Sequence, residues 1–293
     1  MKCDMHVHTV HSGMCTIPVL DRIARESYAD PRELYDVLKR RGMDLVTVTD
    51  HDSIDAAEAL RHHPDFFLSE EVTATAPSGT ELHVGVYDIN ERQHIQVQRR
   101  RRDLLSLVAY LNEQRLFFTV NHLFSGLTGR RTETDFALFA KMFPGMETRN
   151  GQMLDAANRA AEQFAAEFNR APVGGSDAHA VASAGTTWTE APRSRSKREF
   201  LAAVARGHGR ALGESGSVGK LTRDVFSITV AAMSERPWLF SIAPLVAVTI
   251  PCWTVANALL ERRFAGQWAR ALPSAPRQET FWPVREILPE VAA

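Results

Sequence analysis

Six of the eleven histidines lie at or near the ends of short apolar runs, each close in sequence to a carboxylate or amide side chain. They are His6, His8, His51, His83, His122 and His179. Imidazole and carboxylate groups are the protein ligands of zinc, manganese and iron. Because the six accompany one strand-like segment after another, we expect them to converge on a single group of metal ions. The first interpretation is therefore a metal-dependent hydrolase.

Two of the histidine motifs have a spacing suited to chelation. His6 and His8 are two residues apart on an extended segment, so their side chains project from the same face and can reach one ion. Asp177 and His179 repeat this spacing. Asp4, one alternation before His6, is a candidate to orient the ligands from outside. A single His-x-His is also common as a buried polar pair, but several such motifs in one chain favour a metal centre.

Residues 2–212 alternate between short apolar runs and helical patterns. Strands are predicted at Lys2–His6, Leu45–Thr49, Phe66–Thr73, Glu81–Tyr87, Phe117–Asn121, Gly145–Thr148, Pro172–Gly175 and Thr186–Glu190. Alternation of strands and helices indicates an α/β fold with parallel strands and right-handed crossovers, either a barrel or an open doubly wound sheet. In both folds, reactive groups gather at the carboxyl ends of the strands. The histidines are predicted to lie there.

Helices are predicted between these strands. Asp30 is a suitable N-cap, Pro31 suits the first helical position and Gly42 ends the same helix. Further helices are predicted at 96–114, 133–142, 152–169 and 196–206. The loop from Thr9 to Ala29 is unusually long, which is typical of a functional lid or of a surface insertion.

A Gly- and Ser-rich linker divides the chain. The predicted parts are a catalytic domain at 1–212, the linker at 213–220 and a C-terminal helical segment at 221–293. Within the last part, 237–260 holds no formally charged residue and is long enough to cross a bilayer. Its internal prolines, Pro244 and Pro251, also fit a pair of short helices packed on protein. Both interpretations stay open.

The bulk composition excludes several classes of protein. The chain has 293 residues and a net charge of −1, so no global charge favours a nucleic acid or a membrane surface. Its three cysteines are far apart and indicate no disulfide framework. The amino terminus has no signal-peptide pattern. We therefore expect a cytoplasmic catalytic domain, attached to the inner face of a membrane if 237–260 is an anchor.

Taken together, the motifs resemble the PHP family, the polymerase and histidinol phosphatase domain of metal-dependent phosphoesterases. The matching segments, in the family's order and spacing, are Asp4–Thr9, Thr49–Asp52, Glu70–Thr73, Leu82–Gly85, Val120–His122, Glu147–Asn150 and Gly175–His179. The resemblance implies a distorted seven-stranded (β/α)7 TIM-like barrel. It also implies two or three divalent ions, zinc, manganese or iron, at the carboxyl ends of the strands.

The resemblance also implies a ligand for each position. One ion would be held by His6, His8, Glu71 and Asp177. A second would be held by His51, Glu71, His83 and His122, with Glu71 bridging. His179 matches a further or shared position. Glu71 is chosen over Glu70 because the family pattern is a carboxylate, an apolar residue and then Ser or Thr, as in Glu71-Val72-Thr73.

One departure from the family pattern concerns a third ion. Gly13 stands where the family usually has an aspartate or a further histidine. Either the third ion is missing, or His11, Cys15 or a residue of the long loop such as Asp21 replaces the ligand.

The expected reaction is hydrolysis of a small phosphomonoester or nucleotide by metal-activated water. Two ions ~3.5–4 Å apart would clamp the phosphate and generate hydroxide at neutral pH. His83 and His179 are candidates to protonate the leaving group. Arg130, Arg131 and Asn150 are candidate substrate contacts, since guanidinium groups match phosphate geometry. Nucleic acid is not indicated beyond nucleotides or short oligonucleotides.

Two other functions stay open. The missing aspartate fits a catalytically reduced metal-binding regulatory module. A metal-dependent amidohydrolase also begins with His-x-His, but that family typically bridges its ions with a lysine, and no lysine of this chain ends a predicted strand.

Overall fold

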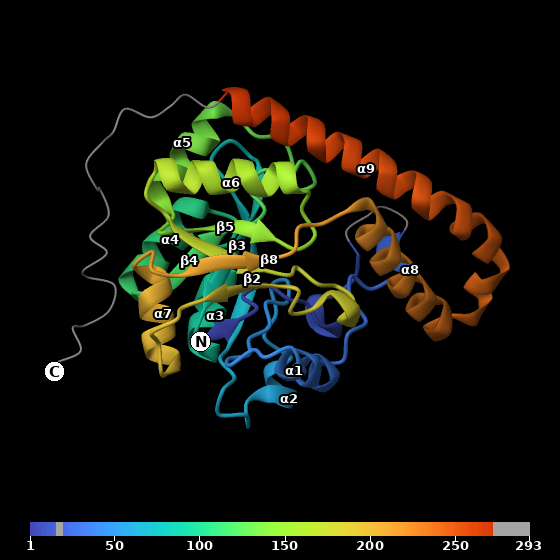
Figure 1. Ribbon diagram of the computed structural model, residues 1–293, viewed down its shortest axis with the longest axis horizontal. Helices are drawn as coiled ribbons and strands as arrows, with labels where there is room; N and C mark the ends of the chain where they lie inside the picture. The colour runs from blue at the N-terminus through green and yellow to red at the C-terminus, as the bar shows by residue number, and fades with distance from the viewer. Residues whose placement is uncertain (16–19, 272–293) are drawn as a thin grey trace.

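Strands and helices alternate along the computed structural model, which describes residues 1–15 and 20–271 and has an α/β fold (Figure 1). The strands are β1 (Lys2–Cys3), β2 (Ser69–Thr75), β3 (Glu81–Tyr87), β4 (Phe117–Val120), β5 (Gly145–Asn150), β6 (Ala171–Gly175), β7 (Thr187–Glu190) and β8 (Arg210–Gly213). The end of the predicted C-terminal segment, beyond Ala271, lies outside the described residues.

The α-helices are α1 (Pro31–Arg40), α2 (Ala57–Leu60), α3 (Glu91–Arg100), α4 (Leu104–Glu113), α5 (Glu133–Met142), α6 (Asp155–Glu167), α7 (Lys197–Ala205), α8 (Val218–Glu235) and α9 (Ala243–Ala271). Helices α1, α5, α6 and α7 lie close to the predicted positions, whereas α2 was not predicted. The 3-10 helices are η1 (Val10–Ser12), η2 (Leu20–Arg22), η3 (Val181–Ser183) and η4 (Pro237–Ile242). The single helix predicted at 96–114 is wrong, because Asp103 caps α4 and separates it from α3.

The strands of the described residues form two sheets, in the orders β2-β3-β4-β5-β6 and β1-β7-β8. Only β4, β5 and β6 pair in parallel within these sheets, and the other neighbours are antiparallel. The prediction of parallel strands is therefore confirmed for β4, β5 and β6 and wrong for β3, which is antiparallel to both of its neighbours. A tight turn between Ala76 and Thr80, with Gly79 at φ 83°, returns the chain from β2 directly into β3 and makes the pair antiparallel. Strand β8 was not predicted.

Irregular extended segments connect the two sheets. After β1, the backbone N–H of Met5 donates to Gly174 O (3.4 Å), and that of Thr49 donates to Val7 O (2.9 Å). The segment 45–51, predicted partly as a strand, makes only isolated parallel bridges. Regular strand pairing therefore closes no barrel within the described residues, although hydrogen bonds run along both sides of the amino-terminal segment.

The main core lies between the five-stranded sheet and helices α4, α5 and α6. Buried aromatic rings fill it, among them Phe118 and Phe136. Trp268, near the end of α9, belongs to the same core, and its ring centroid is 4.8 Å from that of Phe136. The last part of α9 is thus built into the α/β body.

The C-terminal segment forms a helical pair that extends from the body, as Figure 1 shows. Ser217 caps α8, and η4 connects α8 to α9. Helix α9 is continuous through Pro251, so two short proline-broken helices are not found. Helix α9 packs on α6 and α8, and tertiary packing of this kind stabilises a helix against the cost of an internal proline, about 3 kcal/mol. By length and hydropathy, Pro237–Arg270 could cross a membrane, and 17% of its most apolar window is buried.

Candidate metal centre

The structure brings all eight sequence-predicted metal ligands together. They fall into four groups within which the ligand atoms lie within 4.8 Å of one another. The groups are His6–His8–Asp177, His6–Glu71–His122, His51–Glu71–His83 and His8–His51–His179. Shared members make the four groups one continuous cluster.

Glu71 lies at the middle of this cluster. Its Oε2 is 3.2 Å from His6 Nε2, 3.4 Å from His8 Nε2 and 3.3 Å from His51 Nδ1. Its Oε1 is 3.5 Å from His83 Nδ1 and 3.3 Å from His122 Nε2. The two oxygens of one carboxylate therefore face two different sets of imidazoles, which is the arrangement that a bridging ligand requires.

Asp177 provides a second carboxylate beside the amino-terminal histidines. Its Oδ1 is 3.5 Å from His6 Nε2 and 3.3 Å from His8 Nε2. Asp177 has φ 51° and His122 has φ 30°, in the left-handed region that L residues rarely adopt. Such conformations cluster at functional sites, where the surrounding structure holds them.

His83 reaches the cluster by a route that differs from the prediction. It lies near the amino end of β3, whereas the sequence was expected to place it at a carboxyl end. Because β3 is antiparallel to both β2 and β4, its amino end lies beside their carboxyl ends. The reversed strand therefore delivers His83 to the same edge as the other ligands.

Hydrogen bonds from surrounding residues fix the ligands. Glu147 Oε1 is 2.8 Å from His6 Nδ1, and Asn121 Nδ2 donates to Glu71 Oε1 (2.8 Å). Such outer contacts set the orientation and tautomer of metal ligands. Glu147 and Asn121 belong to the recognised motifs, but the sequence assigned them no role, since nothing in their spacing distinguishes them from ligands.

Two aspartates anchor the backbone around the cluster. Asp4 accepts from the backbone N–H groups of Ser176 (2.8 Å) and Gly185 (2.7 Å), so it holds segments together and orients no imidazole directly. Asp50 accepts from the hydroxyl of Ser12 (2.7 Å), whose Oγ lies 3.0 Å from His8 Nδ1. Asp50 thus acts on His8 through Ser12.

Burial and charge set the proton affinities of the ligands. Burial alone would raise the pKa of Glu71, but the neighbouring imidazoles, His6 first, hold it well below its usual range. Burial alone would lower the pKa of His6, but the carboxylates of Glu71 and Asp177 raise it well above its usual value. Burial lowers the pKa of His8 to about 3. Glu71 is thus ionised and His8 neutral at neutral pH, as cation binding requires.

The donor set fits divalent cations. Glu71 Oε2 is buried and has no hydrogen-bond partner within the described residues, although three imidazole nitrogens surround it. A buried ionised oxygen without a hydrogen bond is costly unless a positive charge compensates it. Imidazole nitrogens around shared carboxylates are the donors that zinc, manganese and iron accept.

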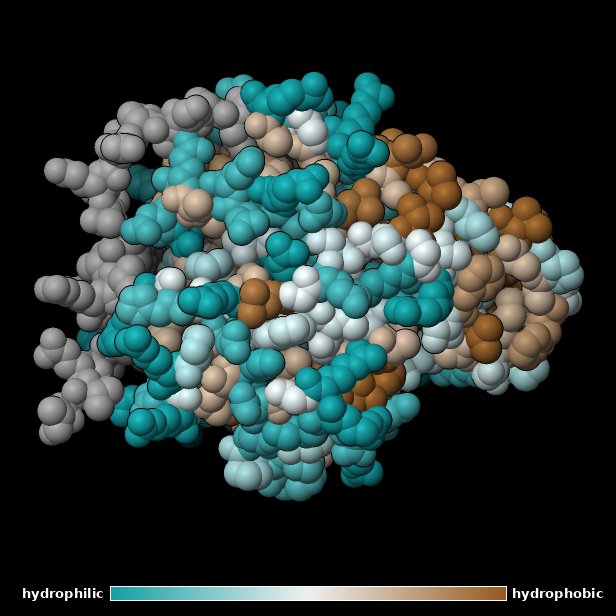
Figure 2. Space-filling view, viewed as in Figure 1, coloured by the Kyte–Doolittle hydropathy of each residue, from teal (hydrophilic) through white to brown (hydrophobic). Residues whose placement is uncertain are grey.

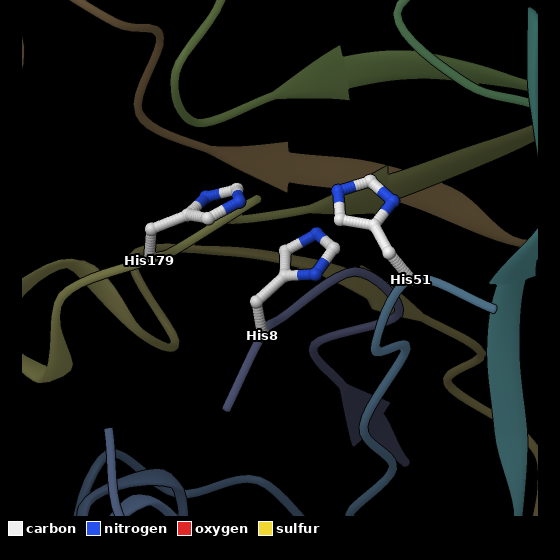
Figure 3. Close-up of side chains that lie close together, drawn as sticks. All are labelled: His8, His51 and His179. Carbon is white, nitrogen blue, oxygen red and sulfur yellow. The ribbon is translucent and has the colours of Figure 1, made fainter. Parts of the chain in front are cut away.

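A carboxylate that the sequence did not predict lies beside the histidines of the fourth group. Glu26 Oε2 is 3.6 Å from His51 Nε2, and its Oε1 is 3.8 Å from His179 Nε2. Burial raises the pKa of Glu26. Figure 3 shows the rings of His8, His51 and His179, which come from three separate segments and lie close together. Glu26 belongs to the long loop from Thr9 to Ala29, which was predicted to be a functional lid or a surface insertion. No sequence pattern in that loop distinguishes Glu26 from its neighbours.

The predicted substitutes for the missing aspartate lie elsewhere. None of His11, Cys15 and Asp21 belongs to the four ligand groups found among the described residues. Asp21 is exposed on η2.

Two of the three predicted substrate contacts, Arg131 and Asn150, have other side-chain partners in the structure. Arg131 is buried, donates to Glu81 O (2.7 Å) and to Thr128 Oγ1 (2.6 Å), and burial lowers its pKa to about 10. Asn150 Nδ2 donates to Asp177 Oδ2 (3.0 Å), so its amide supports a predicted ligand. Arg130 is exposed, and its contact with substrate stays a prediction.

Comparisons with known proteins confirm the resemblance to the PHP family. A family model described as PHP-associated matches residues 155–208. This segment contains Asp177 and His179. An uncharacterized protein of Methanocaldococcus jannaschii is 37% identical over 54 residues, which are 18% of this chain and 30% of that protein.

Solved structures of other proteins have a similar fold. A two-domain protein from Bacteroides vulgatus, described as containing a predicted PHP-like metal-dependent phosphoesterase, superposes with a TM-score of 0.55 at 18% identity, over 78% of this chain and 69% of that one. PsfC from Pseudomonas syringae superposes with a TM-score of 0.54 at 17% identity, over 80% of this chain and 98% of that one. At these identities the likeness concerns the fold. The ligand cluster, rather than the likeness of fold, supports a general metal-dependent hydrolase.

Proposed function

We propose that this protein is a metal-dependent phosphoesterase that hydrolyses a small phosphomonoester or nucleotide. The observation that carries the proposal is the convergence of eight candidate ligands into one cluster, with the carboxylate of Glu71 at its middle. Two or three zinc, manganese or iron ions bound there would supply Lewis-acid activation of water and of the phosphoryl group. The chain's own residues hold those ions at fixed positions and present them to the substrate.

The exposure of the imidazoles indicates which of them meet the substrate. The side chains of His6 and His8 are 1% and 0% exposed, whereas those of His83 and His179 are 16% and 21% exposed. We assign His83 and His179 to the open side of the centre, where a side chain can reach the leaving oxygen and transfer a proton to it. His6 and His8 serve only as ligands.

We also assign the fold to the distorted (β/α)7 barrel type. Seven extended segments would form the ring: residues 5–8, residues 45–51, and strands β2 to β6. Backbone hydrogen bonds between Thr49 and Val7, and between Glu71 and Asp50 (3.2 Å), support continuity on one side of the amino-terminal segment. The backbone hydrogen bond from Met5 N–H to Gly174 O supports continuity on the other side of this segment, next to β6.

The test of the catalytic proposal is a substrate screen on the full chain loaded with manganese, zinc or iron. p-Nitrophenyl phosphate and nucleoside phosphates should be hydrolysed, and a chelator should abolish turnover. Binding of ions without turnover of any phosphoester would instead support a regulatory module. Hydrolysis of amides or lactones alone would support an amidohydrolase.

We further propose that the helical pair α8–η4–α9 attaches a cytoplasmic protein to the inner face of a membrane. Its outer surface is apolar, as Figure 2 shows at the right of the molecule. Trp238, Leu245 and Val248 are 62%, 63% and 66% exposed, and Leu260 near the other end of the apolar stretch is 64% exposed. A surface helix of this kind, with tryptophan at its edge, suits the boundary between lipid head groups and acyl chains.

Flotation with vesicles of phosphatidylcholine and phosphatidylglycerol tests the membrane proposal. The protein should float with the vesicles, and Leu245→Ser with Val248→Ser should release it. Leu105→Ser is the matched control, because Leu105 is 48% exposed on α4, away from the helical pair. Failure to float, together with dimers that the double variant disrupts, would assign the apolar surface to a second copy of the chain.

A further inference from the structure

We infer that Glu26 supplies the carboxylate ligand of a third cation position at His8, His51 and His179. The inference rests on the proposed metal centre and adds a residue to it. Each of the other three ligand groups already contains a carboxylate, Glu71 or Asp177, whereas this group consists of imidazoles alone. Glu26 is the carboxylate whose oxygens face the Nε2 atoms of His51 and His179.

The Glu26 carboxylate lies between two imidazoles that come from different parts of the chain. Its oxygens are 3.6 Å from His51 Nε2 and 3.8 Å from His179 Nε2, too long for hydrogen bonds. His179 Nε2 is buried and has no hydrogen-bond partner in the part of the chain that the structure describes. His51 turns its other nitrogen, Nδ1, towards Glu71. A carboxylate and imidazole nitrogens that converge in this way form a donor set for a divalent cation.

The backbone holds Glu26 at this position. The Glu26 N–H donates to Gly13 O (3.1 Å). The next residue, Ser27, is buried, and its hydroxyl lies within hydrogen-bond distance of the backbone carbonyls of both His8 (3.3 Å) and His179 (3.0 Å). The loop is therefore tied to the backbone of His8 and His179, two of the three histidines of this group. Gly13 stands where the family usually has an aspartate. The backbone hydrogen bond between Glu26 and Gly13 places the Glu26 carboxylate close to that position in the chain.

The C-terminal helical pair supports the same loop from outside. Arg25, next to Glu26, forms an ion pair with Glu235 of α8 (3.4 Å), and Ile23 packs on Leu239 and its neighbours. These contacts join the loop to α8 and η4.

The experiment counts bound ions in the full chain by inductively coupled plasma mass spectrometry after manganese or zinc loading and desalting. Wild type should retain three ions per chain, and Glu26→Gln should retain two. Asp21→Asn is the matched control, since Asp21 is an exposed carboxylate of the same loop, and it should retain three. Glu26→Asp, with its shorter side chain, should weaken only the last ion, by about tenfold or more.

The melting temperature of the metal-free protein is the second readout. It should be the same for wild type and Glu26→Gln, since a ligand acts only when its cation is bound. Equal ion counts in wild type and Glu26→Gln, whether three or two, would overturn the inference and leave the proposed function intact. A wild type that retains no ions would overturn both.

Discussion

Glu70 and Glu71 are adjacent in β2, but their side chains point to opposite faces of the strand, as successive side chains of a strand do. Glu71 faces the imidazoles of the centre. Glu70 is equally buried, and its Oε2 accepts from His94 Nδ1 (2.9 Å) and Gln98 Nε2 (2.8 Å). Glu71 is therefore the candidate ligand, and Glu70 is a buried carboxylate with hydrogen-bond partners on the other face of the strand.

Glu71→Gln should reduce metal affinity by about 100-fold or more, since loss of an outer contact alone typically costs 10–100-fold. Glu70→Gln should keep full affinity, because an amide oxygen can still accept the hydrogen bonds of Gln98 and His94. Isothermal titration with zinc or manganese measures both. Equal affinities in the two variants would refute the bridging role of Glu71.

The raised pKa of His6 makes metal affinity depend on pH. The nearby carboxylates favour the protonated imidazole, and a cation has to displace that proton. Affinity should therefore fall as pH drops through the raised pKa of His6, by about tenfold per pH unit for each proton displaced. His8, with a pKa of about 3, should add no competition above about pH 4. Competition titrations between pH 6 and 9 measure this slope, and a flat profile would contradict it.

At the scale of elements, close backbone approach brings the amino-terminal histidines to β6. Gly175 lies against His6, and a Cβ at Gly175 would be 2.5 Å from the His6 backbone nitrogen. A larger residue at this point would push the ligand-bearing segment away from Asp177. The geometry of the centre thus depends on a glycine that binds nothing itself.

Gly175→Ala should destabilise the protein by about 1–3 kcal/mol or more through overpacking, and it should lower metal affinity at the same time. Gly219→Ala is the control, because a Cβ there meets no atom within 4 Å and Ala favours the first turn of α8. Urea unfolding measures both variants. A Gly175→Ala protein as stable as wild type would show that the contact is not tight.

Much of the site could be predicted from sequence because its ligands sit in short, ordered motifs. Helix α1 was also predictable, since Asp30, Pro31 and Gly42 are local signals that need no tertiary information. The orientation of β3 was not, because strand direction depends on which neighbours pair. Glu26 was missed for a related reason: it lies in an irregular loop, where no periodicity marks the residues that face inward.

At the scale of the whole molecule, helix α9 is buried in the core at its end and exposed to solvent earlier along its length. The last turns of α9 bury Trp268 in the main core, and Glu261 Oε1 accepts from the Gly126 N–H (3.0 Å). Its first turns expose apolar side chains, Trp253 among them. Deletion of the C-terminal segment would therefore remove part of the core along with the exposed apolar surface, so point substitutions distinguish the two better.

Trp268→Ala should lower the free energy of unfolding by about 3–5 kcal/mol, as expected for a large buried side chain. Trp253→Ala, at a side chain 45% exposed, should change it by about 0.5 kcal/mol or less and should instead weaken vesicle binding. Denaturant unfolding and flotation together distinguish the variants. Comparable destabilisation by both would show that the apolar surface is packed in solution.

The most direct test of the metal centre is anomalous diffraction from crystals loaded with manganese or zinc. The strongest peaks should lie on the two sides of the Glu71 carboxylate, one bonded to His6, His8 and Asp177 and the other to His51, His83 or His122. Bound ions located only away from Glu71, or none in a loaded crystal, would contradict the account.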